Sequence, residues 1–194
     1  MTPFMRNNVD FESISRDEIL ATFNFVIIGG SESSATALTG IFNHLSRKEN
    51  RDILGTLCAD IRVISEGLRL CNPVPGGLPR VVPEGGDTYC GIFLPEGTRL
   101  EARNFAINRS QKYFDNPDKL SASKPFTSGF HCCLGRPLAM LELRLVIIKV
   151  LLAFDVSVDS ADSVNFDDFP VIMLIQKLPM VLRLKSRDVG IEVV

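Results

Sequence analysis

The residues best suited to chemistry lie in one ten-residue loop, Phe126–Gly135, with the sequence FTSGFHCCLG. A histidine and two adjacent cysteines stand between two glycines, immediately before a long apolar segment. A thiolate in a glycine-rich loop that runs into a helix N-terminus is stabilised by backbone N–H groups and by the helix dipole. Such a position favours a soft, negatively charged sulfur ligand. We therefore expect this loop to be the seat of the chemistry.

The cysteines favour free thiols or ligands over a disulfide framework. Their number, five, is odd, Cys132 and Cys133 are adjacent, and no secretory signal precedes them, so we expect a reduced, intracellular setting. A zinc or iron–sulfur site at His131, Cys132 and Cys133 is disfavoured, because adjacent cysteines rarely chelate one tetrahedral ion and no distant Cys-x-x-Cys completes the site. Inert, buried thiols are the expected state of Cys58, Cys71, Cys90 and Cys132.

A second unusual cluster, Gly29-Gly30-Ser31-Glu32-Ser33-Ser34, interrupts an apolar helical pattern. Glycine costs roughly 1 kcal/mol against alanine inside a helix, and serine competes for local hydrogen bonds. The cluster therefore indicates a bulge or the close approach of a ligand. A helix kink packed closely against a neighbour is the better interpretation of this segment on its own. A phosphate-binding loop is weaker, because no Gly-Lys-Ser/Thr follows the glycines.

A third motif is the pair Glu66 and Arg69, which stand three residues apart on one predicted helical face. The usual interpretation is a solvated surface pair worth a few tenths of a kcal/mol. The turn-rich stretch Pro73–Gly77 follows directly and favours a buried structural role.

Helices must position these motifs. A capping box is predicted at Ser15-Arg16-Asp17-Glu18, and the spacing of apolar residues predicts one long helix from there to about His44. A second helix is predicted over Arg51–Leu70. Pro137 suits the first turn of a third helix, which we expect to be buried on most sides because apolar residues occupy more than one face.

Short strands and loops fill the rest of the chain. Turn residues separate strand-like runs, and residues 104–124 are predicted to be mostly surface loop. The expected fold class is mainly α with small antiparallel β-sheets (α+β). The predicted strands are Arg80–Val82, Thr88–Leu94, Thr98–Ala102, Phe154–Asp159, Val171–Gln176 and Met180–Lys185.

Composition excludes some functions. The chain is 45% apolar and 23% charged with a formal charge of −2, and it has no basic stripe, so we expect no nucleic-acid partner. The longest apolar run near the N-terminus, Phe23–Gly30, is much shorter than the roughly 20 residues of a spanning helix. We therefore expect no membrane anchor in this chain.

Together the three motifs resemble the C-terminal half of a cytochrome P450, the family of heme-thiolate monooxygenases. The family's cysteine loop, Phe-x-x-Gly-x-Arg-x-Cys-x-Gly, matches Phe126, Gly129, Cys133 and Gly135, with His131 where the family usually has arginine. This register implies that Cys133, and not its neighbour, is the axial iron ligand. The order of all three motifs along the chain makes the resemblance specific.

The other two motifs have counterparts in the same family. The helical cluster resembles the oxygen-activation motif, with Gly29 and Gly30 beside the heme and Glu32 and Ser33 as the implied catalytic residues that relay protons. Ser33 replaces the usual threonine. Glu66-x-x-Arg69 resembles the family's structural ion pair.

The resemblance also implies a cofactor, partners and a location. The cofactor is heme (iron protoporphyrin IX), and electrons come from NADPH through NADPH-cytochrome P450 reductase. The implied reaction inserts one oxygen atom from dioxygen into a small organic substrate. The residue sequences of the motifs are most similar to those of fungal enzymes of secondary metabolism. The endoplasmic reticulum membrane surface is implied, or the cytoplasm if no anchor is present. The implied heme-contacting residues are Gly29, Gly30, Arg80 (to a propionate), Phe126, Gly129, His131 and Gly135.

Differences from the family pattern lead to further expectations. Family members are far longer, so residues 1–194 are expected to form one portion of a truncated P450 domain that lacks its N-terminal half. A Pro-Glu-Arg-Phe-like segment is missing before Phe126, so Glu66 and Arg69 are expected to lack a third partner. A neutral His131 is expected to hold a propionate less firmly than arginine. The alternative function is therefore an inactive remnant or a heme-binding pseudoenzyme.

Overall fold

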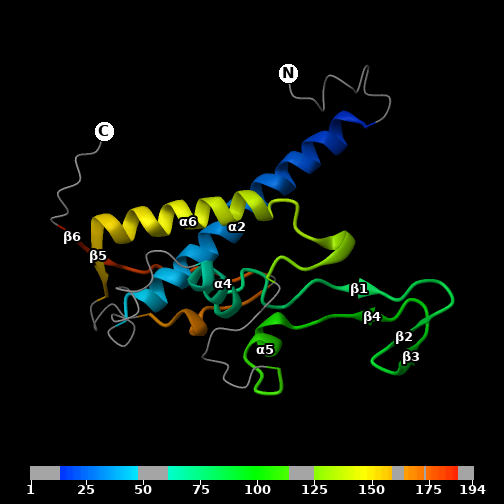
Figure 1. Cartoon of the computed structure of the whole chain (residues 1–194). Helices are drawn as coiled ribbons and strands as arrows, with labels where there is room; N and C mark the ends of the chain where they lie inside the picture. Colours follow the sequence, from blue (N-terminus) through cyan, green and yellow to red (C-terminus); the bar gives the residue numbers. More distant parts are fainter. Residues whose placement is uncertain (1–13, 48–60, 114–124, 159–163, 173, 188–194) are drawn as a thin grey trace.

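The structure is a computed structural model of the chain, and it describes residues 14–47, 61–113, 125–158, 164–172 and 174–187. Its longest helices are α2 (Arg16–Leu45), α4 (Ile61–Leu70) and α6 (Arg136–Ala153). Figure 1 shows α6 crossing α2, with α4 beside them and thin two-stranded ribbons extending away. The predicted class, mainly α with small antiparallel sheets, is confirmed.

Helix α2 begins and ends where its sequence predicts. Ser15 Oγ accepts from the Glu18 N–H at 3.2 Å, and the Glu18 carboxylate accepts from the Ser15 N–H at 2.9 Å, which completes the capping box. The hydrogen bond from the Ser15 backbone lowers the pKa of Glu18. The helix is α-helical throughout, so the bulge considered at Gly29–Ser34 is not formed. The close packing against a neighbour, which was the better interpretation of this segment on its own, is also wrong, because a Cβ on Gly29 or Gly30 would meet nothing within 4 Å.

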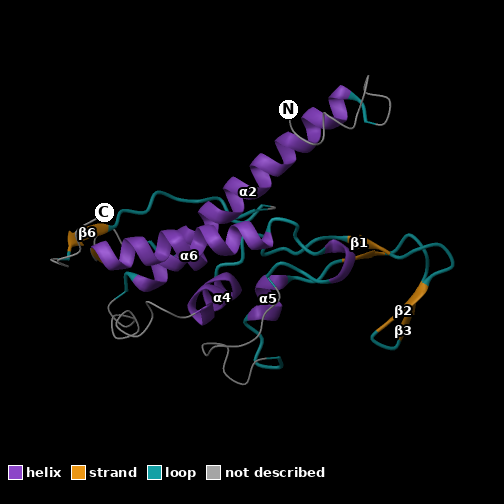
Figure 2. Cartoon of the chain, turned by 45° about the horizontal axis from the view of Figure 1, so that its top comes forward, coloured by secondary structure: helices purple, strands orange, loops and turns teal. Residues whose placement is uncertain are grey.

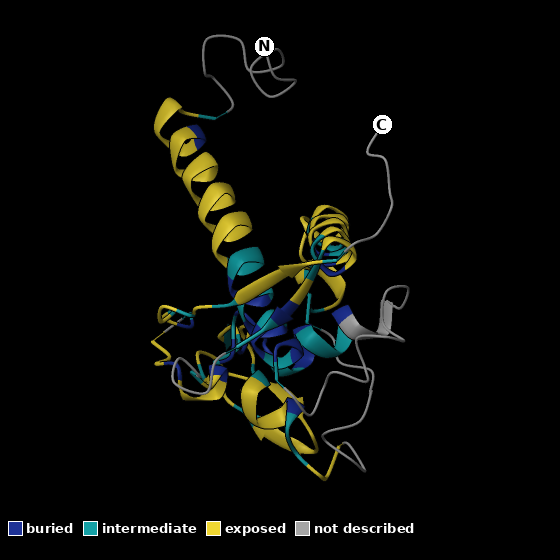
Figure 3. Cartoon of the chain, turned by 90° about the vertical axis from the view of Figure 1, so that its left-hand side faces the viewer, coloured by how far each residue is buried: buried dark blue, intermediate teal, exposed yellow. Residues whose placement is uncertain are grey.

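The core lies on one side of α2 only. The C-terminal half of α2 is buried against α4, α6 and strand β5, whereas its N-terminal half is exposed, as the yellow ribbon in Figure 3 shows. Packing of helix on helix removes apolar area from water and is the main source of stability here. The buried apolar cluster consists of Ala37, Ile41, Leu45, Ile64, Leu68, Leu143, Ile147, Leu151 and Val156.

Two glycines let α2 and α4 approach closely. A Cβ added to Gly40 would lie 2.5 Å from Cys71 Sγ and 3.0 Å from Phe166 Cζ. A Cβ added to Gly67 would collide with the side chain of Ile41. By contrast, a Cβ on Gly29 would meet nothing within 4 Å. Gly40 and Gly67 are thus packing residues, while the side of α2 at Gly29 is open.

Gly40→Ala is therefore expected to destabilise the fold. Overpacking a filled core costs about 1–3 kcal/mol, which outweighs the gain of about 1 kcal/mol from better helix propensity. Gly29→Ala is the matched control and should stabilise the heme-free chain by up to about 1 kcal/mol, because only the propensity term remains. Urea unfolding of both variants measures this difference. A Gly40→Ala variant as stable as Gly29→Ala would contradict the close packing.

The strands form separate antiparallel pairs. Strand β1 (Arg80–Val81) pairs with β4 (Arg99–Leu100), β2 (Asp87–Tyr89) with β3 (Ile92–Leu94), and β5 (Phe154–Ser157) with β6 (Arg183–Ser186). These pairs lie at the edges of the helical body in Figure 2. The predicted positions of β1, β4, β5 and β6 agree with the structure to within a few residues.

Two strand predictions were wrong. The run Thr88–Leu94 is not one strand, because Cys90 and Gly91 both have positive φ, 52° and 81°, and close a two-residue hairpin between β2 and β3. The run Val171–Gln176 forms only an isolated bridge between Val171 and Ile175. In that segment Gln176 N–H donates to the carbonyl of Pro170 at 2.8 Å, which turns the chain back on itself.

One helix was not predicted and one helix prediction needs correction. Residues 104–124 were predicted to be mostly surface loop, and within them α5 (Asn104–Asn108) forms and buries Asn108. The predicted burial of α6 on most sides is wrong, because only Leu143, Ile147 and Leu151 are buried. A helix that is apolar on several faces can still pack on only one of them. The part of the predicted second helix before Ile61, with Cys58, lies outside the described residues.

Helix α2 is long and apolar enough, by length and composition alone, to cross a membrane. The prediction of no candidate anchor relied on the run Phe23–Gly30 and missed that the helix extends this run on both sides. A core helix of a soluble protein passes the same test, and Ala37 and Ile41 of α2 do lie in the core. The length of α2 is therefore weak support for membrane insertion.

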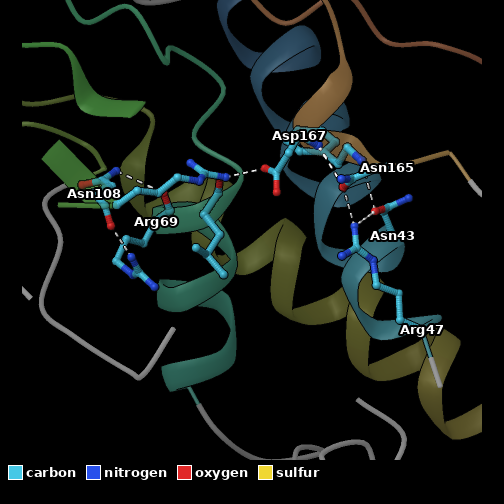
Figure 4. A network of polar contacts seen from close by, with 9 residues as sticks. Asn43, Arg47, Arg69, Asn108, Asn165 and Asp167 are labelled. Atoms are coloured by element: carbon cyan, nitrogen blue, oxygen red, sulfur yellow. Dashed lines mark hydrogen bonds and ion pairs between the residues drawn. The ribbon is translucent and has the colours of Figure 1, made fainter. Parts of the chain in front are cut away.

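A polar network ties the C-terminal end of α2 to the rest of the body (Figure 4). Asn43 Oδ1 accepts from Arg47 Nη2 at 2.8 Å, and Arg47 Nη2 also donates to Asn165 Oδ1 at 2.7 Å. Arg109 Nη2 donates to Asp167 in η5 (Phe166–Asp168) and to the carbonyl of Leu70 at 2.9 Å. Contacts far apart in sequence thus lock α2, α4 and η5 together.

Candidate functional site

The loop Phe126–Gly135 is closed by its own backbone. The Cys133 N–H donates to the carbonyl of Phe126 at 3.0 Å, and the Cys132 N–H donates to the carbonyl of Gly129 at 3.1 Å. Gly129 has φ +70°, a left-handed conformation that glycine adopts without steric cost, and it starts the short helix η3 (Gly129–His131). This geometry fixes the backbone that presents the Cys133 side chain.

Cys133 stands in a favourable electrostatic position. It lies two residues before Gly135, the N-cap of α6, and its own carbonyl accepts from the Arg136 N–H at 3.3 Å. The free N–H groups at a helix N-terminus favour negative charge, so they stabilise a thiolate there. Pro137 occupies the first turn of α6, as predicted. The thiol is exposed and free to act as a ligand.

The other cysteines differ from Cys133 in burial. Cys71 is buried, and burial raises the pKa of its thiol far above the usual value, so it is inert. Cys132 is half-buried. Cys90 is exposed in the β2–β3 turn, so its predicted burial is wrong; the reason is the hairpin, which carries it away from the core.

Two large apolar side chains within the cysteine loop are exposed to solvent. Leu134 is 99% exposed and Phe130 is fully exposed, although both are large hydrophobic residues. Gly29 and Gly30 on α2 likewise have open space where a side chain would stand. The exposed thiol is a donor that suits iron, and the uncovered apolar side chains and open glycine backbone suit contact with an apolar macrocycle. No three His, Cys, Asp or Glu gather as metal ligands among the described residues.

The hydroxyls and the carboxylate of the α2 cluster have separate partners. Ser33 Oγ donates to the carbonyl of Gly29 one turn earlier. Ser34 Oγ donates to Glu142 Oε2 at 3.1 Å, which joins α2 to α6 nine residues after Cys133. Glu32 forms an ion pair with Lys177. Neither Glu142 nor Lys177 was predicted, because each contacts α2 from more than 100 residues away and no local spacing signals it.

Glu66 and Arg69 form a buried ion pair on α4. Arg69 Nε donates to both carboxylate oxygens of Glu66, at 2.8 and 2.9 Å, and the Arg69 side chain has no exposed area. Arg69 Nη1 also donates to the carbonyl of Asn108, whereas the segment from which a third partner is expected to be missing lies outside the described residues. Asn108 Nδ2 returns a hydrogen bond to the Arg69 carbonyl at 3.0 Å (Figure 4). The unpredicted helix α5 supplies this partner.

Two further predicted heme contacts lie on different elements. Arg80 is in β1, and its Nη1 donates to the carbonyl of Pro79 at 2.9 Å. His131 is exposed at the end of η3, and its carbonyl accepts from Thr127 Oγ1. The missing Pro-Glu-Arg-Phe-like segment was inferred between Phe114 and Phe126, and residues 114–124 lie outside the described part.

Known proteins share this fold. A solved zebrafish cytochrome P450 with abiraterone superposes with a TM-score of 0.77 at 21% identity, over 90% of this chain and 50% of that one. The fold is therefore that of a cytochrome P450. The family described as Cytochrome P450 matches residues 61–183. This chain belongs to the cytochrome P450 family.

Similar sequences come from fungi. Cytochrome P450 monooxygenase lcsI of Purpureocillium lilacinum is 30% identical over 90% of this chain and 40% of its own length. Cytochrome P450 monooxygenase astJ of Aspergillus oryzae is 31% identical over 94% of this chain and 44% of its length. Versicolorin B desaturase of Dothistroma septosporum is 30% identical over 82% of this chain and 38% of its length. The chain thus spans about two fifths of these curated relatives.

Proposed function

We propose that this chain is the heme-binding, C-terminal portion of a fungal cytochrome P450 monooxygenase of secondary metabolism. The reaction inserts one oxygen atom of dioxygen into a small organic substrate, and the other leaves as water. Two electrons come from NADPH through NADPH-cytochrome P450 reductase, and two protons come from solvent. The endoplasmic reticulum surface is the proposed location.

The observation that carries this proposal is the presentation of Cys133. Its thiol is exposed at the N-terminal end of α6, and backbone hydrogen bonds from Phe126 to Arg136 hold the loop around it. Of the other cysteines described, Cys71 is buried, Cys132 is half-buried and Cys90 lies in the β2–β3 hairpin. Cys133 is therefore the best placed to bind iron.

Heme fits the residues present, and each has a proposed role. When bound, a heme with a thiolate ligand supplies an electron-rich iron that favours O–O cleavage. Cys133 would hold the iron, with Phe126, Gly129 and Gly135 shaping the loop. Gly29 and Gly30 would let the helix backbone approach the macrocycle, and Arg80 and His131 would contact propionates.

Protons would be held by the α2 cluster. Glu32 Oε can accept a proton from solvent because its side chain is 49% exposed. Ser33 Oγ can pass a proton on, since a hydroxyl both donates and accepts. In the structure Ser33 donates to the Gly29 carbonyl, which leaves its lone pairs able to accept.

A second candidate is a heme-binding pseudoenzyme or inactive remnant. The observation that favours it is His131, which stands where the family usually has an arginine and is exposed. Weaker propionate binding would misplace the heme without preventing iron ligation.

The heme-carbon monoxide spectrum tests the proposal. The purified chain is loaded with heme, reduced and exposed to carbon monoxide, and the red-shifted Soret band of a thiolate ligand is the expected result. A heme-free protein, or an unshifted band, would overturn it. Substrate-dependent NADPH consumption with a reductase then separates the two candidates. Product above the background without substrate favours the enzyme, and none favours the pseudoenzyme.

A further inference from the structure

We propose that Lys177 is a positioning residue for Glu32: its ammonium group holds the carboxylate of the α2 cluster in one place. This inference rests on the proposed function, because Glu32 has a proton-transfer role only there. It adds a residue from the C-terminal segment, 145 positions away in sequence, to the α2 cluster.

Lys177 contacts two residues of α2 that lie about one helical turn apart. Lys177 Nζ donates to Glu32 Oε2 and lies 3.5 Å from Thr36 Oγ1. Glu32 and Thr36 are four residues apart, so they lie on the same face of α2. Thr36 is buried, and the Lys177 side chain is only 28% exposed. The lysine is thus partly withdrawn from solvent at the point where it meets the carboxylate.

The chain on both sides of Lys177 is anchored. Ile175 is buried against Phe166 and Phe169, and the following Gln176 N–H donates to the Pro170 carbonyl at 2.8 Å. On the other side, Met180 Sδ accepts from Asn43 Nδ2 of α2 at 3.4 Å. Because these contacts fix the chain on both sides of Lys177, the lysine reaches Glu32 without a rearrangement of the segment.

This pairing determines what the carboxylate can do. Glu32 is half exposed, and a free glutamate of that kind samples several rotamers. An ammonium partner in contact with the carboxylate removes that freedom, so Glu32 stays in one orientation on α2. Ser33 follows Glu32 on α2 but its side chain points to a different face of the helix, so we propose that the fixed carboxylate serves the hydroxyl through solvent.

Carbodiimide cross-linking tests the pair without heme. This reagent joins a carboxylate and an amine only when they are in contact, so the full chain should yield an isopeptide bond between Glu32 and Lys177, detected by peptide mass spectrometry. Lys177→Arg keeps the charge but removes the reactive amine, and the cross-link should disappear. Lys185→Met, on exposed strand β6, is the matched lysine control and should leave it intact. Absence of the cross-link in the unaltered chain would overturn the proposal.

Product formed per NADPH in the heme-loaded chain tests the role. Lys177→Met is expected to lower this ratio about tenfold, within the range of general acid–base effects, with a matching rise in peroxide release. Lys177→Arg should restore most of it, which a purely structural role would not predict for the same site. An unchanged ratio in Lys177→Met would overturn the positioning role. If no thiolate spectrum forms, the proposed function is wrong and the positioning role is wrong with it. The cross-link is a separate test, because it detects the contact between Lys177 and Glu32 without heme.

Discussion

Cys133→Ser is expected to abolish the red-shifted carbon monoxide band completely. Serine offers a neutral hydroxyl, which is a harder and weaker iron ligand than a thiolate and does not push electron density onto the metal. The loop itself should survive, because the Cys133 contact to Phe126 is made by the backbone N–H at 3.0 Å. Reduced carbon monoxide difference spectra of the heme-loaded variant measure the loss.

Cys132→Ser is the matched control for this experiment. The two cysteines are adjacent, yet Cys132 is half-buried with its Sγ 4.0 Å from the Cys133 carbonyl, whereas Cys133 is exposed. The control variant should therefore keep the full band. Loss of the band in Cys132→Ser together with its retention in Cys133→Ser would show that Cys132, and not Cys133, is the iron ligand. Circular dichroism of both variants shows that the helices remain.

Glu66→Leu is expected to destabilise the fold by about 3–5 kcal/mol, because it leaves a buried guanidinium without its counter-charge. Arg69 has no exposed side-chain area, and Glu66 accepts from its Nε at 2.8 and 2.9 Å. Removing the carboxylate therefore removes the partner that compensates the lost hydration of the cation. The free energy of unfolding, from urea titration followed by circular dichroism, measures the effect.

Two further variants sharpen this test. Asp155→Asn breaks the pair between Asp155 and Arg187, which is largely exposed, and should cost less than about 1 kcal/mol. The double variant Glu66→Leu/Arg69→Met removes the buried charge itself, so it should be more stable than Glu66→Leu alone. A cost for Glu66→Leu no larger than that for Asp155→Asn would show that the α4 pair is not buried in solution.

The buried pair on α4 has a further partner that no local spacing predicts. The resemblance implies only that a third partner of Glu66 and Arg69 is missing from the segment before Phe126. In the structure the Asn108 carbonyl accepts from Arg69 Nη1, and the Asn108 side chain binds the Arg69 carbonyl. Backbone and amide groups thus satisfy the guanidinium.

Some features were predictable because they depend on residues close together in sequence. The capping box from Ser15 to Glu18 and the 3.6-residue spacing of α2 determine where that helix begins and ends. Pro137 marks the first turn of α6. The same local information placed the cysteine loop before a helix N-terminus, and the family resemblance selected Cys133 within it.

Burial was less predictable, since apolar spacing does not say how many faces of a helix find a partner. Leu138 and Leu141 continue the apolar pattern of α6 but are exposed, while Leu143 is fully buried. Likewise the glycines Gly29 and Gly30 are unfavourable in a helix by propensity, yet α2 is one continuous helix through them.

The sequence by itself determined the starts of α2 and α6, the cysteine loop and the motifs that define the family, because each is encoded within a few neighbouring residues. Only the tertiary structure decided that Asn108 meets Arg69 across 39 residues and that Lys177 meets Glu32 across 145. Such contacts arise from how helices pack and where loops are anchored, and no local periodicity records them. The thiol of Cys133 was visible in the sequence, but the partner of Glu32 was visible only in the fold.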